Sequence, residues 1–97
     1  MEVQINAIHF EITDKLVAYI NKKIDRLVRR YESIVGVDVT LKVIKPETAM
    51  NKEAGILLEV PGYDDIFASK VADSFEAAVD LSIEALERQL ERIKGKK

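Results

Sequence analysis

The 97-residue chain has no cysteine, no tryptophan and a single histidine. Without cysteine it has no disulfide, no thiolate metal ligand and no cysteine nucleophile, and a reducing compartment suits it. The lone histidine, His9, has no neighbouring serine or aspartate that would predict a catalytic triad. The sequence also lacks a glycine-rich phosphate loop and the spacing of an EF-hand. It therefore predicts no enzyme, no bound metal, no cofactor and no small-molecule substrate.

Long hydrophobic runs are missing as well. No stretch approaches the roughly 20 apolar residues of a membrane span, and the N-terminus lacks the basic region of an export signal. Since 47% of the residues are hydrophobic and 33% are charged, we expect one globular domain over residues 1–97. We expect it in the cytoplasm, with no membrane partner.

Apolar periodicity predicts four strands and two helices. The strands are expected at residues 3–10, 37–45, 54–60 and 66–70, with a polar loop over 46–52 that begins at Pro46. The first helix is expected to begin after Thr13, its N-cap. The second helix is expected to begin at a capping-box-like pair, Asp73 and Glu76, and to end at Gly95.

The order β-α-β-β-β-α predicts an α+β fold, a two-layer sandwich similar to double-stranded-RNA-binding domains. Each strand has one apolar face and each helix one apolar stripe, so both helices should cover the same face of a four-stranded sheet. The opposite face should stay solvated, with Gln4, Asn6, Thr40, Lys42 and Glu59.

Charge is sorted along the chain, although the net charge is only −2. Residues 13–31 hold six basic and two acidic side chains, whereas residues 32–91 hold 13 acidic and 5 basic ones. The bases of the first helix lie opposite its apolar stripe and surround one aromatic residue, Tyr19. This pattern is typical either of a solvated helix face or of an electrostatic footprint for RNA. Arg88 and Arg92 would extend such a footprint, and Glu87 and Glu91 would flank and weaken it.

Four short motifs occur in one order along the chain: Phe10-Glu11-Ile12-Thr13, Ile66-Phe67-Ala68-Ser69, Ala77-Ala78-Val79-Asp80 and Leu86-Glu87-Arg88-Gln89-Leu90. With these motifs the chain resembles the ribosome hibernation factor family, which includes the hibernation promoting factor and the ribosome-associated inhibitor. The resemblance spans essentially the whole chain. It implies a non-catalytic translation inhibitor that occupies the messenger and transfer-RNA sites of the small ribosomal subunit in starvation or stationary phase.

The resemblance also implies which residues contact ribosomal RNA. The family's basic positions fall on Lys23, Arg26 and Arg29 in the first helix and on Arg88 and Arg92 in the second. With two further bases from the charge pattern, the candidate RNA-binding set is Lys22, Lys23, Arg26, Arg29, Arg30, Arg88 and Arg92.

Three departures from the family reduce the positive charge of the second helix. Ala85 stands where the family usually has lysine, and Glu91 where it is often polar or basic. Residues 70–76 (KVADSFE) replace the family's glycine- and tyrosine-containing entry to this helix. The chain ends at Lys97 and so resembles the short form, without the C-terminal dimerisation domain, and ribosome pairing would require another factor. The alternative function is a protein-interaction module that modulates a sigma factor through its acidic surface.

Overall fold

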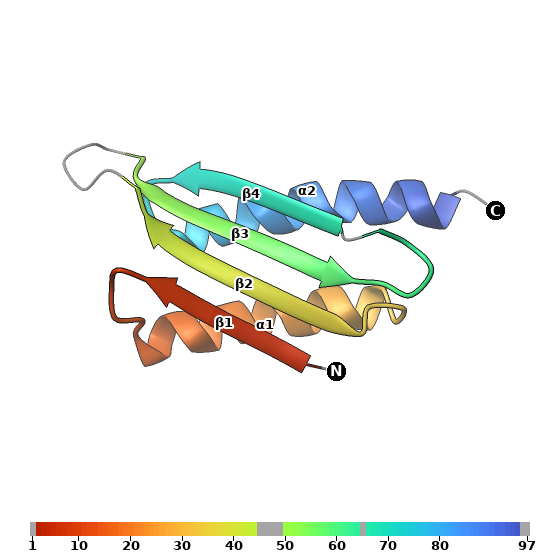
Figure 1. Ribbon diagram of the computed structural model, residues 1–97, viewed down its shortest axis with the longest axis horizontal. Helices are drawn as coiled ribbons and strands as arrows, with labels where there is room; N and C mark the ends of the chain where they lie inside the picture. The colour runs from red at the N-terminus through yellow and green to blue at the C-terminus, as the bar shows by residue number, and fades with distance from the viewer. Residues whose placement is uncertain (1, 45–49, 65, 96–97) are drawn as a thin grey trace.

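The computed structural model describes residues 2–44, 50–64 and 66–95. In these ranges the order is the predicted β-α-β-β-β-α (Figure 1). The elements are β1 (Glu2–Ile8), α1 (Asp14–Arg30), β2 (Gly36–Val43), β3 (Lys52–Glu59), β4 (Ile66–Ala72) and α2 (Phe75–Gly95).

The four strands form one sheet in the order β1-β2-β3-β4. β1 runs parallel to β2, whereas β3 is antiparallel to both β2 and β4. Both helices lie on one side of this sheet, with α1 behind β1 and β2 and α2 behind β3 and β4 (Figure 1). The predicted α+β fold, with both helices covering the same face, is thus confirmed.

The core fills the space between the sheet and the helices. Its largest fully buried aliphatic side chains come from α1, β2, β3 and α2, and they are Ile20, Ile24, Val39, Leu41, Ile56, Leu58, Val79 and Leu86. Phe10 and Phe75 stack with their ring centroids 4.6 Å apart, and this contact joins the turn after β1 to the start of α2. Among the described residues, neither helix is long and apolar enough to cross a membrane.

The ends of several elements differ from the prediction. β1 stops at Ile8 because His9 adopts a positive φ of 64°, which takes the chain out of the strand. Lys52 belongs to β3 and not to the expected loop, and its pairing with Ala72 extends β4 two residues beyond Lys70. The expected stop at Pro46 lies outside the described residues.

The structure confirms the predicted cap of α1 and contradicts that of α2. Thr13 caps α1 as predicted, because its Oγ1 accepts a hydrogen bond from the Leu16 N–H at 3.2 Å. The predicted Asp73 and Glu76 pair is wrong: α2 starts one residue later, and Ser74 Oγ accepts from the Ala77 N–H at 3.2 Å. Asp73 instead accepts a hydrogen bond from the Met50 N–H at 3.0 Å.

Candidate nucleic-acid interface

The seam between α1 and α2 forms a groove on the helical side of the molecule. Its volume is about 300 Å³, and it is lined by Lys23, Arg26, Leu27, Arg30, Ile83 and Glu87. Three and four residues separate the three cations, so they share one face of α1 next to the buried stripe. The groove therefore joins an apolar floor to three positive charges.

Carboxylates from α2 meet two of these cations. Arg30 Nη1 lies 2.7 Å from Glu87 Oε2, and Lys23 Nζ lies 3.6 Å from Asp80 Oδ1. Arg26 has no ion pair within the described part of the chain. The groove thus contains paired and unpaired cations side by side.

Two tyrosines of the α1 segment also donate to carboxylates of α2. The Tyr19 hydroxyl lies 2.8 Å from both carboxylate oxygens of Asp80, and the Lys23 ammonium lies 5.4 Å from the centre of the Tyr19 ring. Burial, followed by this hydrogen bond, raises the pKa of Tyr19 to about 12. The Tyr31 hydroxyl donates to Glu91 Oε2, and burial together with that bond raises the pKa of Tyr31. Both hydroxyls therefore remain protonated donors at neutral pH.

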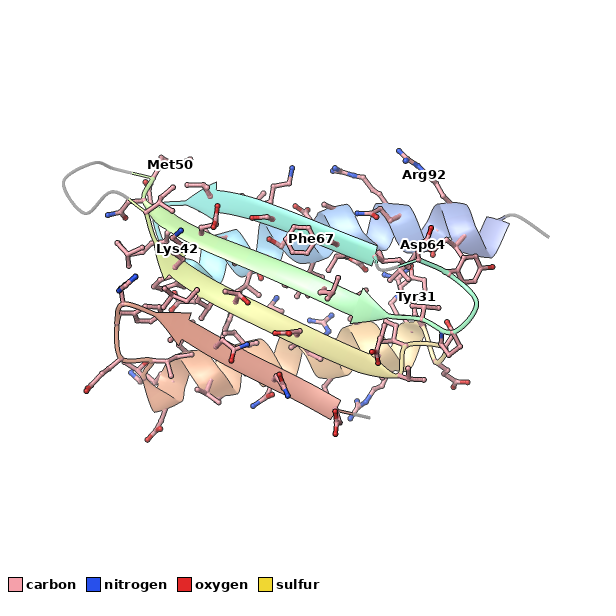
Figure 2. All side chains as sticks on the ribbon, in the orientation of Figure 1. Tyr31, Lys42, Met50, Asp64, Phe67 and Arg92 are labelled. Atoms are coloured by element: carbon pink, nitrogen blue, oxygen red, sulfur yellow. The ribbon has the colours of Figure 1, made fainter. Side chains whose placement is uncertain are left out.

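A second, shallower hollow continues from the groove along α2. It has a volume of about 470 Å³ and is lined by Arg30, Tyr31, Glu87, Arg88, Glu91 and Arg92. Arg88 and Arg92 are exposed, and Figure 2 shows Arg92 extending from α2 away from α1. Arg88 and Arg92 thus line the same hollow as Glu87 and Glu91, and their contact with RNA stays a prediction.

The remaining two predicted residues lie elsewhere on α1. Lys22 lines a hollow on the α1 side of β1, together with Val3 and Asp25. Arg29 Nη2 lies 3.4 Å from Asp25 Oδ2, four residues earlier on the same helix, and both side chains are exposed. The structure therefore brings Lys23, Arg26 and Arg30 together in the groove and places Lys22 and Arg29 on the outer side of α1.

The sequence prediction missed the part played by Asp80. Asp80, Glu87 and Glu91 are separated by seven and four residues, which places all three on one face of α2. That spacing was visible in the sequence. Its meaning depends on α1 lying beside this face, which only the packing of the helices reveals.

Comparison with known proteins identifies the family of the chain. The sequence model of the family described as Sigma 54 modulation protein / S30EA ribosomal protein matches residues 3–97. The chain therefore belongs to this family of ribosome-associated proteins, as its motifs predicted.

Two relatives are named ribosome hibernation promoting factors. The chain is 30% identical to a ribosome hibernation promoting factor of Pseudomonas putida over 96 residues, which cover 99% of this chain and 89% of the relative. It is 32% identical to the factor of the same name from Azotobacter vinelandii, covering 99% and 85% of the two chains.

Two solved structures share the fold. One is a ribosomal subunit interface protein from Coxiella burnetii, with 25% identity and a TM-score of 0.86 over 99% of this chain and all of that one. The other is the N-terminal domain of Protein Y from Thermus thermophilus, with 26% identity and a TM-score of 0.78 over 96% and 99% of the two chains.

Proposed function

We propose that this chain is a ribosome-binding hibernation factor that occupies the messenger and transfer-RNA sites of the small subunit in starvation or stationary phase. The observation that carries the proposal is the basic groove and outer face of α1, in a chain whose relatives are named ribosome hibernation promoting factors. Its place of action is the cytoplasm, where ribosomes translate.

The inhibition is steric, and no reaction is catalysed. A body measuring 47 × 23 × 19 Å blocks a cleft in ribosomal RNA once it is held there. Cations that neutralise phosphates release counterions and supply affinity, while the shape of the cleft supplies specificity. The predicted set of seven cations supplies these phosphate contacts. Its most available members are those without an ion pair among the described residues, and they are Lys22, Arg26, Arg88 and Arg92.

Sedimentation tests this proposal. Purified protein should pellet with small subunits at low salt and dissociate steeply as salt rises, with a log-log slope near −4 for about five phosphate contacts. Recovery of the protein only in the ribosome-free fraction at low salt would refute the proposal.

A pair of matched variants localises the surface. Arg26→Gln removes a cation from the groove, and Lys42→Gln removes one from the exposed sheet face on the other side of the molecule (Figure 2). We expect Arg26→Gln to weaken binding several-fold and to reduce the slope by about 0.9, and Lys42→Gln to leave the slope unchanged. Equal effects of the two variants would show that the interface lies elsewhere.

The open sheet face favours a second candidate, a protein-interaction module that modulates a sigma factor. One end of this face has a hollow of about 210 Å³, lined by three carboxylates, those of Glu2, Asp38 and Glu59, and by half-buried Leu57. Phe67 lies on the same face, turned toward the viewer in Figure 2, and is 54% exposed. Aromatic side chains are enriched in protein contacts, and polar side chains form the rim of such contacts.

Capture experiments separate the two candidates. A protein contact through the sheet face should survive nuclease and high salt and should be lost in Phe67→Ser. Binding that nuclease or salt abolishes, and that Phe67→Ser leaves intact, would reject this second candidate.

A further inference from the structure

We propose that Glu87 and Asp80 of α2 are internal competitors for RNA phosphate: they occupy the charged ends of Arg30 and Lys23 and lower the affinity of the groove for RNA. This inference rests on the proposed function, because it concerns the regulation of the same surface.

The ion pair between Arg30 and Glu87 connects the two helices across the groove. Arg30 Nη1 lies 2.7 Å from Glu87 Oε2, and the side chain of Arg30 is 63% exposed while that of Glu87 is 30% exposed. The guanidinium is therefore within reach of a large ligand from solvent, whereas its carboxylate partner is held close to the seam. RNA that approaches this groove finds the arginine already paired.

The second pair is held in place by a tyrosine. Asp80 accepts a hydrogen bond from the Tyr19 hydroxyl at 2.8 Å, and this contact keeps its carboxylate beside the Lys23 ammonium at 3.6 Å. Asp80 therefore has a fixed position even though its side chain is 44% exposed.

A carboxylate and a phosphate offer a guanidinium or an ammonium the same kind of anionic oxygen. To bind Arg30, a phosphate must displace Glu87 or share the arginine with it. In either case the contact contributes less to the free energy of RNA binding than a contact with an unpaired arginine would. Arg26 lines the same groove without such a partner among the described residues. The two arginines should therefore contribute unequally to RNA binding.

The consequence is a groove that binds RNA more weakly than its positive charges alone would predict. Weaker phosphate contacts act mainly on the dissociation rate. The pairs with α2 thus favour release of the protein from RNA, which a factor that must leave the ribosome requires.

The test compares two isosteric variants of α2. Glu87→Gln removes the competitor of Arg30, and Glu84→Gln, three residues earlier, removes the same charge from an exposed side chain without an ion pair in the described ranges. Binding is measured by titration against purified small subunits and against an RNA duplex of about 16 base pairs, the length that a double-stranded-RNA-binding domain spans, at several salt concentrations. Urea unfolding of each variant checks the fold.

We expect Glu87→Gln to bind both targets about two- to fivefold more tightly at low salt, the range set by the strength of exposed ion pairs. Its log-log salt slope should steepen by about 0.9 on the duplex, because one more cation is free to neutralise a phosphate. Glu84→Gln should tighten binding less and keep the wild-type slope. Asp80→Asn should act in the same direction as Glu87→Gln, and it carries the test should Glu87→Gln fail to fold.

Two results would overturn the inference. Equal gains in Glu87→Gln and Glu84→Gln would mean that only long-range charge matters. Unchanged or weaker binding in Glu87→Gln would mean that Glu87 positions Arg30 and does not compete for it. If the wild-type chain fails to bind small subunits, the proposed function fails, whereas the duplex comparison still decides whether the carboxylates compete.

Discussion

Replacing Tyr19 with phenylalanine removes a hydroxyl that links α1 to α2 and leaves the aromatic ring in place. The hydroxyl lies 2.8 Å from both oxygens of Asp80, which is 61 residues away along the chain. A hydrogen bond to a charged group contributes about 1.5–3 kcal/mol to stability. Because the Asp80 side chain is 44% exposed, water replaces part of the lost interaction, and we expect a loss of about 1–1.5 kcal/mol.

Urea unfolding at pH 7 measures this loss directly, and thermal unfolding should show a decrease in Tm of about 4–12 °C for a domain of this size. Tyr63→Phe is the matched control, because Tyr63 is 52% exposed and its hydroxyl makes no hydrogen bond to the described residues. A Tyr19→Phe protein within about 0.3 kcal/mol of wild type would refute the reasoning. An equal loss in Tyr63→Phe would also refute it, because the loss would then come from removing any tyrosine hydroxyl and not from the bond to Asp80.

Three further predictions concern stability. The pKa of Tyr19 is raised from 10.0 to about 12 in the folded protein, so the unfolded chain loses this proton first as pH rises. The contribution of this group to the free energy of unfolding should be fully present below pH 10 and should fall by about 1–2 kcal/mol toward pH 12. Urea unfolding at pH 9 and 11 measures this decrease, which should be smaller in Tyr19→Phe. Ser82→Ala should cost about 1–2 kcal/mol, since the fully buried hydroxyl donates to the Ala54 carbonyl at 2.8 Å, and wild-type stability in this variant would contradict that account. Ile56→Ala should cost about 2–5 kcal/mol because the side chain is fully buried, whereas Leu57→Ala, on the open face of the same strand, should cost clearly less.

The sequence predicted the architecture because each element obeys its own local period. The stripe of α1 and the alternation of β2 and β3 were strong enough to assign their faces, and Leu16, Ile20 and Ile24 are indeed buried. The ends of elements depended on features without such a pattern. The pairing of Lys52 with Ala72 is a tertiary contact, and the apolar alternation of β1 does not predict the positive φ at which His9 ends the strand.

The basic surface was only partly predictable. Charge counting identified α1 as the most basic element, and helical spacing separated its cations from its core. Neither method gives the position of α2 around α1, which decides that Arg30 meets Glu87, 57 residues later, while Arg26 meets no carboxylate in the described ranges. A set of seven candidate residues thus divides into groups only once the helices are packed.

This division changes where the attraction for RNA should be strongest. The ion pairs to Asp80 and Glu87 reduce the field in the groove, while Lys15, Lys22 and Arg26 are exposed and have no ion pair among the described residues. These three side chains follow one another at seven and four residues, so they form a positive stripe along about 16 Å of α1. Because affinity for a phosphate backbone follows the local field, this stripe of unpaired cations, which reaches the groove at Arg26, should attract the RNA, and the paired cations of the groove should fix its orientation. Loss of Lys15, a residue outside the predicted set, should therefore reduce the salt slope of ribosome binding more than loss of Lys23 does.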